Sequence, residues 1–554
     1  MSQQTTVTDF SREAVESFVQ TVVFVDDKIY GSYGGAIREP KKLAGAVKIR
    51  KTASKKAVKK AATKEARQEV QIEEPQFSPH DIQASFAKKR IVCSLHQPLR
   101  QNSVGTASDT YKLCASADII IVDWDLYGDA GEKARELVKN LVVQSLEDDP
   151  HQLRLVLIYT DNPNLFDVAD SLFRVLNDNV KSEIDYPEAD QGLAFHTLNA
   201  RVVVLGKPAN RTLDLDDFVV EETALADRAV SEFCKLADGL LQGCILKGLA
   251  EIRKQSRKIL TKFHSGLDAA FLTHRALGLP HEEAFEHVTP LLVSEIEAVL
   301  EDGLAKPLVE SEVIENWCEA VWVPAEHAEN ILPDDVGLCE FSKSLCEKGL
   351  ELPTEHRAKL SRKSRDALNK NPPRWPSSDS ADFKSLTTFH SVDDSGDDSR
   401  ELGMLMSLRT QYGDNHRLTL GTIIRELSGD KRYLICLQPP CDSVRLRGNT
   451  VFMFCLLGES TGQKIANVVQ HDGAFVDLTY KPKIENGVAL IFNARSSKGV
   501  VHADNLVFTD SKDNEYAWVA QLKSHHAQRA VEEFARNLSR VGLIESEWLR
   551  LKAM

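Results

Sequence analysis

The sequence lacks the features that would place a protein outside the cell or across a membrane. Its ten cysteines include no Cys-x-x-Cys pair, and no long apolar run is present. The N-terminal stretch, MSQQTTVTDFSREAVESF, is polar and helix-like rather than apolar. These absences argue against a disulfide framework, a membrane-spanning helix and a secretory signal. We therefore expect a cytoplasmic protein without a membrane partner.

Signatures of common output domains are missing as well. The sequence contains no P-loop, no His-Glu-x-x-His, no zinc-ligand spacing and no convincing helix-turn-helix unit. Gly458 to Gly462 match Gly-x-Ser-x-Gly, but the residues TGQK favour a hairpin turn at this point. Cys441 would become a reactive thiol only beside a cation such as Arg445 or His471. We expect no separate enzymatic output, and an effector enzyme that uses Cys441 remains an alternative.

Charge is distributed unevenly along the chain. The formal net charge is −14, which does not suit a general nucleic-acid binder. Residues 38–67 nevertheless hold twelve Lys or Arg against two Glu, which leaves the remainder near −24. This basic stretch lies in an insertion over about residues 31–78 that is too poor in large apolar residues to bury much. A phosphorylation-controlled nucleic-acid binder that uses residues 38–67 is a second alternative.

The N-terminal third alternates apolar strands with amphipathic helices. With 554 residues, roughly three domains are expected. Strands that are apolar throughout are typical of a parallel sheet covered by helices on both faces. We therefore predict an α/β domain with a five-stranded, doubly wound parallel sheet of the flavodoxin-like kind. The five strands are expected at residues 21–27, 91–95, 117–122, 154–160 and 200–208.

The sequence pattern changes twice in the remainder of the chain. A strongly periodic segment follows the sheet, then a Pro-, Ser- and Asp-rich stretch, and then short strands punctuated by turns. We expect a mainly antiparallel β domain that ends in a closing helix. The predicted domains are residues 1–215 (the α/β domain), 216–350 (helical), 351–404 (linker) and 405–554 (β-rich with a terminal helix).

Polar residues stand at four of the predicted strand ends: Asp26 with Asp27, Asp123, Thr160 and Lys207. The carboxyl ends of parallel strands meet at one edge of a sheet, where ligands bind. Crowded carboxylates suit a hard cation with oxygen ligands such as Mg²⁺. A lysine supplies a point charge for a phosphate bound beside such an ion. The residues at this edge of the sheet therefore predict a site for magnesium and phosphate.

The ordered set VDD, IVDWDL, LIYT and LGKP resembles the receiver domain of two-component response regulators over roughly residues 20–215. The resemblance implies that Asp123 accepts a phosphoryl group from a histidine kinase. It also implies that Thr160 is the switch hydroxyl and that Lys207 contacts the acyl phosphate.

The metal site follows from the same resemblance. Asp26 and Asp27 match the acidic pair that holds Mg²⁺, and Asp123 is a third ligand. The backbone carbonyl of Asp125 is implied as a further ligand.

Two positions depart from the receiver pattern or invite a hypothesis. The place three residues before Lys207, which usually holds an aromatic switch residue, is Val204. Rotation of an aromatic ring there is therefore not expected to carry the signal. Asp125 lies two residues beyond Asp123, with Asn162 two beyond Thr160. A negative group at Asp125 is expected to hinder an attacking water and so to set the lifetime of the acyl phosphate.

The C-terminal half, with its Cys-Asp-bearing β domain, resembles large receiver proteins of bacterial anti-phage operons. The stand-alone receiver protein of Detocs-type systems is the nearest kind. That resemblance implies a regulator or phosphate sink that draws phosphoryl groups from a histidine kinase and away from a receiver-linked effector.

Overall fold

The chain folds into two compact units in the computed structural model, one of residues 1–279 with 285–384 and one of residues 280–284 with 385–554. The predicted basic insertion lies almost wholly outside the residues that the structure describes. The described residues are 7–30, 78–148, 153–180, 184–185, 190–197, 199–208, 215–237, 239–278, 284–303, 362–370, 397–410, 416–460, 465–494 and 499–538.

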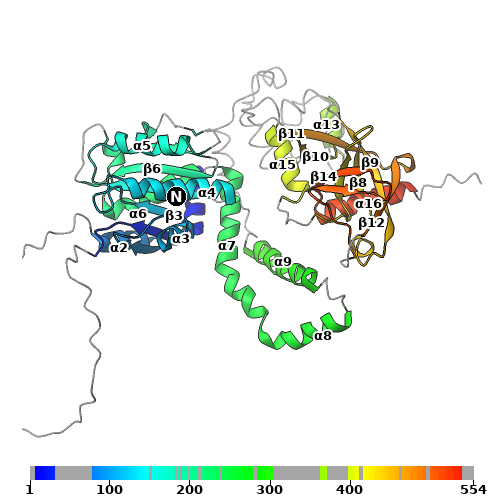
Figure 1. Cartoon of the computed structure of the whole chain (residues 1–554), viewed down its shortest axis with the longest axis horizontal. Helices are drawn as coiled ribbons and strands as arrows, with labels where there is room; N and C mark the ends of the chain where they lie inside the picture. The colour runs from blue at the N-terminus through cyan, green and yellow to red at the C-terminus, as the bar shows by residue number, and fades with distance from the viewer. Residues whose placement is uncertain are drawn as a thin grey trace, which may run out of the picture. The chain divides into compact units, whose positions relative to one another are not determined.

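The first unit is built on a six-stranded sheet in the order β2-β1-β3-β4-β6-β5 (Figure 1). The pairs β1–β2, β1–β3, β3–β4 and β4–β6 are all parallel, which confirms the predicted five-stranded doubly wound sheet. β5 adds an antiparallel edge strand next to β6. The strands are β1 (Thr21–Val25), β2 (Val92–His96), β3 (Ile119–Val122), β4 (Arg154–Thr160), β5 (Ala194–His196) and β6 (Ala200–Gly206).

Helices cover both faces of this sheet. All residues of β3, β4 and β6 are buried, as expected for strands packed on two sides. α2 and α6 pack against each other and against strands on one side, while α3, α4 and α5 pack in sequence as neighbours. The helices are α1 (Val7–Phe18), α2 (Pro79–Lys88), α3 (Asp109–Ala115), α4 (Glu132–Asp148), α5 (Leu165–Asn177) and α6 (Leu225–Leu236).

The helix after the sheet connects the receiver-like part to a helical arm. α7 packs on α1, so its beginning belongs to the same unit as the sheet. α8 and α9 follow it, and α9 runs back beside α7 (Figure 1). The elements are η3 (Asp216–Phe218), η4 (Glu222–Ala224), α7 (Leu240–Lys262), η5 (Ser265–Leu267), α8 (Asp268–Gly278), α9 (Ala284–Gly303) and α13 (Arg362–Leu368).

The second unit is an antiparallel sheet that curls on itself. Its strand path is β10-β11-β9-β8-β7-β14-β13, and β12 also pairs with β9. A bridge between Phe492 and Asp510 brings β12 to the end of β13. The strands are β7 (Thr422–Glu426), β8 (Tyr433–Cys436), β9 (Asn449–Glu459), β10 (Asn467–His471), β11 (Ala474–Tyr480), β12 (Gly487–Asn493), β13 (Val507–Thr509) and β14 (Glu515–Gln521), with η7 (Pro440–Asp442) and η8 (Ile484–Asn486) between them.

Two apolar clusters fill the second unit. One holds the rings of Phe452, Phe454, Phe492, Phe508 and Tyr516. The other contains side chains of the closing helix α16 (Ser524–Leu538), which confirms the predicted β domain with a terminal helix. Helix α15 (Asp397–Ser407) packs on β10, although the sequence predicted a linker over most of its length. In the described part of the chain, no helix is long and apolar enough to cross a membrane.

Candidate functional site

The predicted strand-end residues converge at one edge of the first sheet. Asp26 follows β1, Asp123 follows β3, Thr160 ends β4 and Lys207 follows β6. These strands are neighbours and run parallel, so their carboxyl ends meet. All four side chains are buried, with at most 2% of each residue exposed. The sheet therefore assembles the polar cluster that the sequence predicted.

Lys207 joins two of the carboxylates. Its Nζ donates to Asp123 Oδ1 at 2.9 Å and to Asp26 Oδ2 at 3.1 Å. The other oxygen of Asp26 accepts a hydrogen bond of 2.7 Å from the backbone N–H of Lys28. Asp26 is thus held by two donors, and Lys207 is directed toward Asp123.

Two carboxylate oxygens of this cluster remain without a donor. Asp123 Oδ2 and Asp27 Oδ1 are buried and have no hydrogen-bond partner among the described residues. The second oxygen of Asp27 accepts from the backbone N–H of Tyr127 at 2.9 Å. Asp26, Asp27 and Asp123 each offer an oxygen, and these oxygens lie within 4.8 Å of one another. Unsatisfied buried oxygens at this spacing fit a divalent cation with oxygen ligands, such as Mg²⁺.

The electrostatics of the cluster are unbalanced. Three carboxylates lie close together, and Lys207 is hydrogen-bonded to two of them. Burial raises the pKa of Asp123 to about 7, and the positive charge of Lys207 offsets only part of this rise. Burial likewise raises the pKa of Asp27. Burial alone would lower the pKa of Lys207, but Asp123 and Asp26 outweigh it and raise the value, so the lysine carries its charge at neutral pH. A bound cation would favour the ionised carboxylates.

Thr160 and its neighbours form the side of the site at β4. The Thr160 hydroxyl accepts from the backbone N–H of Asn162 at 3.1 Å, and the Thr160 carbonyl accepts from the N–H of Lys207 at 2.7 Å. The next residue, Asp161, forms an ion pair with Lys28 whose N–O distance is 3.4 Å. The loops after β1 and β4 are thereby linked beside the site.

Asp125 has a structural partner that the sequence did not reveal. Its Oδ1 accepts from the backbone N–H of Ala130 at 3.1 Å, inside the loop between β3 and α4. Tyr127 and Ala130 in this loop have positive φ angles of 65° and 52°, a conformation that costs non-glycine residues energy. Asp125 also lines a hollow of about 490 Å³ together with Trp124 and Asn162. Its carboxylate therefore supports a strained loop, and the residue borders a hollow between the loops after β3 and β4.

Tyr159 is a further buried residue at the site. It precedes Thr160 on β4, and its ring lies 5.7 Å from Lys207 Nζ. Its hydroxyl donates to the carbonyl of Val220 at 2.8 Å. A buried tyrosine hydroxyl needs a hydrogen-bond partner. A tyrosine inside an apolar strand therefore indicates such a hydrogen bond, but the sequence does not show that the acceptor is Val220. At the position of the usual aromatic switch, Val204 is buried within β6.

The predicted alternatives in the second unit find less support. Cys441 is exposed in η7, while His471 Nε2 contacts Arg425 Nη1 at 3.0 Å. Burial raises the pKa of the neighbouring Cys436 thiol to about 12, so that thiol stays protonated. Gly458 lies in β9, and the next described element is the strand β10, whereas a nucleophile elbow joins a strand to a helix.

Comparison with known proteins agrees with the geometry of the first unit. Residues 18–212 match the model of the family described as the response receiver domain. The chain matches no curated protein and no solved structure. The matched range includes every strand of the first sheet and each residue of the acidic cluster. Residues 18–212 therefore match a response receiver domain in sequence, and the fold and the acidic cluster of this part of the chain agree with that match.

Proposed function

We propose that the protein is a phosphoacceptor and that a histidine kinase transfers a phosphoryl group to Asp123. One observation carries the proposal. Asp123 directly follows the buried strand β3. One of its oxygens accepts from Lys207, while the other is buried and has no partner among the described residues. An oxygen in that state suits a nucleophile in a receiver domain.

The chemistry is a transfer between two covalent partners. An oxygen of Asp123 attacks the phosphorus of a phosphohistidine, the nitrogen–phosphorus bond breaks, and an acyl phosphate forms. Phosphoryl transfer depends on positioning and on charge neutralisation more than on covalent chemistry by the protein. In this proposal Lys207 neutralises part of the charge on the phosphoryl oxygens, and the Thr160 hydroxyl turns toward one of them as the switch residue.

Mg²⁺ is the cofactor that the residues would hold. Its ligands would be Asp26, Asp27, Asp123 and the backbone carbonyl of Asp125. When bound, the ion supplies charge neutralisation for the phosphoryl oxygens. The buried oxygen of Asp27 without a donor among the described residues, and the spacing of the three carboxylates, support this assignment.

A phosphate-affinity gel tests the proposal directly. The full chain is incubated with Mg²⁺ and a small phosphodonor, and the wild type is compared with Asp123→Asn. We expect a shifted band for the wild type and none for the variant. Asp170→Asn on the exposed side of α5 is a matched control and should shift like the wild type. No shift of the wild type would contradict the phosphoacceptor chemistry.

We further propose that this phosphoacceptor acts in bacterial anti-phage signalling as a regulator or phosphate sink. The resemblance of its C-terminal half to stand-alone receiver proteins of Detocs-type systems supports this role. A kinase, this protein and a receiver-linked effector are mixed, and phosphate on the effector is followed over time. The wild type should lower the effector's phosphate and Asp123→Asn should not; equal phosphate in both mixtures would contradict the sink.

A further inference from the structure

An ion pair joins two loops on either side of the strand that leads into Asp123. Lys28 lies in the loop after β1 and Asp161 directly after β4, and their N–O distance is 3.4 Å. The strand order places β3 between β1 and β4. Two strand spacings, about 10 Å, therefore separate the ends of β1 and β4. A contact between the loops that follow these strands spans the carboxyl end of β3, where Asp123 lies.

Asp123 is closed to solvent in this state. The residue is 0% exposed, and its second oxygen is buried without a partner among the described residues. Burial raises the pKa of Asp123 to about 7, and the nearby negative charge of Asp161 adds a smaller rise. An attacking oxygen and a leaving group stand roughly in line on either side of a transferred phosphoryl group. Side chains at the entrance must therefore move before a donor can reach this oxygen.

The ion pair is suited to such a movement. The side chains of Lys28 and Asp161 are 40% and 30% exposed, and an ion pair with that much contact to water is held weakly. The backbone N–H of Lys28 donates to Asp26 at 2.7 Å, so the main chain of this loop is fixed while the side chain is not. Asp161 also lines the hollow of about 490 Å³, which gives its carboxylate room when it leaves Lys28.

We propose that the ion pair of Lys28 and Asp161 closes the entrance to Asp123 and must open before a phosphoryl donor reaches the carboxylate. The effect on transfer rests on the proposed phosphoacceptor function, whereas the closure itself does not. In this assignment Lys28 and Asp161 control access to Asp123 and do not contact the reacting atoms. The closed pair therefore slows the uptake of phosphate.

Charge alone would produce a different pattern. Lys28 attracts an anionic phosphodonor and Asp161 repels it. If charge alone mattered, Lys28→Met would slow uptake and Asp161→Asn would speed it. The double variant Lys28→Met/Asp161→Asn keeps the net charge of the pair and would then react like the wild type. Closure by the ion pair instead predicts faster uptake in all three variants.

The rate of phosphate uptake distinguishes these two explanations. The full chain is incubated with Mg²⁺ and acetyl phosphate, and uptake is followed on a phosphate-affinity gel. We expect Lys28→Met, Asp161→Asn and the double variant each to react about two- to fivefold faster than the wild type. The double variant should be no faster than the single ones, because all three lose the same contact. Slower uptake by Lys28→Met, or a wild-type rate for the double variant, would overturn the proposal.

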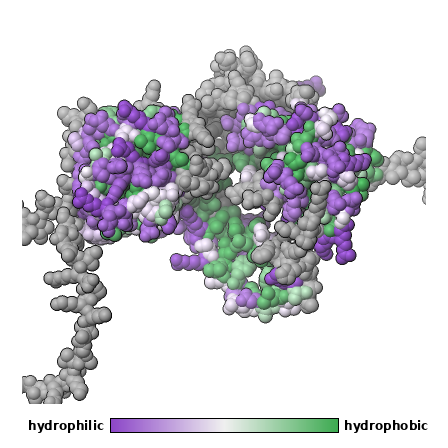
Figure 2. Space-filling view, in the orientation of Figure 1, coloured by the Kyte–Doolittle hydropathy of each residue, from purple (hydrophilic) through white to green (hydrophobic). Residues whose placement is uncertain are grey.

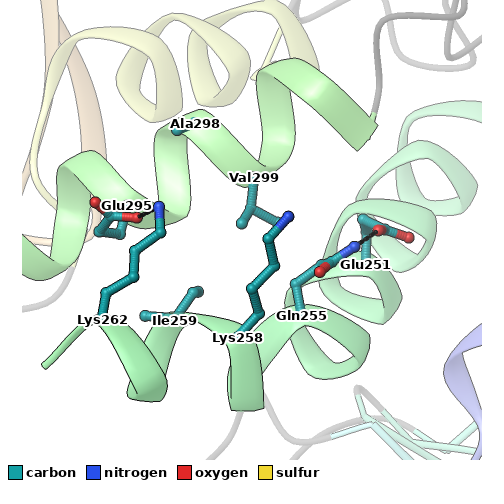
Figure 3. A pocket seen from close by; sticks show the side chains of 8 residues that line it. All are labelled: Glu251, Gln255, Lys258, Ile259, Lys262, Glu295, Ala298 and Val299. Carbon is teal, nitrogen blue, oxygen red and sulfur yellow. Dashed lines mark hydrogen bonds and ion pairs between the residues drawn. The ribbon is translucent and has the colours of Figure 1, made fainter. Parts of the chain in front are cut away.

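A second ion pair of the same unit provides a matched control. Lys262 and Glu295 join α7 and α9, over which hydrophobic surface gathers in Figure 2, and Figure 3 shows their ion pair. Their side chains are 51% and 26% exposed, much like those of Lys28 and Asp161. Lys262→Met/Glu295→Gln should therefore keep the wild-type rate of uptake. Faster uptake by this control would overturn the proposal, since the effect would not depend on the entrance to Asp123.

Chemical labelling tests the closure without phosphoryl transfer. The full chain is treated in mild acid with a water-soluble carbodiimide and an amine, and the amide formed at Asp123 is measured by mass spectrometry. Lys28→Met/Asp161→Asn should be labelled at Asp123 faster than the wild type and the control. Equal labelling rates would overturn the proposal. A wild type that takes up no phosphate would contradict the phosphoacceptor function, and the labelling rates alone then decide whether the ion pair closes the entrance.

Discussion

The hydroxyl of Tyr159 donates a hydrogen bond of 2.8 Å to the carbonyl of Val220, although 61 residues separate the two. The N–H of Val220 in turn donates to the carbonyl of Gly206 at 3.0 Å, directly before Lys207. The segment that leads from the sheet to α6 is thus attached to the strand ends that carry the site. Lys207 contacts the Tyr159 ring, and the Tyr159 hydroxyl binds that segment. A movement of Lys207 can therefore reach the segment through Tyr159.

Two substitutions at Tyr159 should distinguish the role of its hydroxyl from the role of its ring. Tyr159→Phe removes the hydrogen bond and leaves the Val220 carbonyl without this donor, so we expect a loss of about 1 to 2 kcal/mol in the free energy of unfolding. It keeps the ring beside Lys207, and phosphate uptake at Asp123 should persist. Tyr159→Leu removes the ring as well and should slow uptake further. Urea unfolding and the phosphate-affinity gel measure the two effects; equal uptake by both variants would show that the ring does not position Lys207.

Magnesium should stabilise the receiver domain through the acidic cluster. A ligand that binds the folded state alone raises the free energy of unfolding, by about 2.7 kcal/mol at a concentration one hundred times its Kd. We expect Mg²⁺ to raise the Tm of the wild type and to have little effect on Asp27→Asn. Asp81→Asn, at the first turn of α2, is the control and should respond like the wild type. An unchanged wild-type Tm in saturating Mg²⁺ would count against the metal site.

The receiver sheet and its cluster could be predicted because their signals are local. β3 is apolar over its full length and β4 is apolar between Arg154 and Thr160, and an acid or hydroxyl stands at the end of each, so the strand and its site residue can be recognised together. Parallel pairing then places Asp123 beside Asp26 without any knowledge of side-chain contacts.

Other parts depend on contacts between distant residues. β5 has only three residues and owes its existence to pairing with β6. α15 forms within a predicted linker and packs on β10, and Arg400 of that helix pairs with Asp477 of β11. Tyr159 could be recognised as buried, but its partner at Val220 could not. Tertiary contact, rather than local propensity, decided these three features.

Asp125 should affect both the acyl-phosphate lifetime and the loop after β3. Asp125→Ala removes the charge and the acceptor for Ala130, whereas Asp125→Asn removes only the charge. If the charge hinders an attacking water, both variants should lose phosphate faster than the wild type. Asp125→Ala should also lose about 1 kcal/mol of stability, the usual net value of a hydrogen bond. The measurement is the dephosphorylation half-life of each variant. If Asp125→Asn keeps the wild-type half-life, the charge does not hinder the attacking water, and Asp125 only supports the loop after β3.

A buried ion cluster joins β6 to α6 at the end of the sheet opposite the site. Arg201 is fully buried and donates to Glu232 Oε2 at 2.8 Å and to Asp190 Oδ2 at 2.6 Å. Its guanidinium also contacts Nε2 of His196. Burial lowers the pKa of His196, and the charge of Arg201 lowers it further. Burial alone would raise the pKa of Asp190, but hydrogen bonds from Lys235 and Arg201 hold it below its usual value.

These shifts predict a loss of stability in mild acid. The folded state keeps His196 neutral, while the unfolded chain takes up a proton as the pH falls below about 6.5, so acid favours unfolding. The depressed pKa of Asp190 adds a second loss only at much lower pH, as its carboxylate protonates. Urea midpoints should therefore fall between about pH 6.5 and 5, and His196→Gln should reduce this slope. His80→Gln, whose side chain is 90% exposed, is the control and should keep the wild-type slope. Equal slopes for His196→Gln and the wild type would show that another group governs stability in this range.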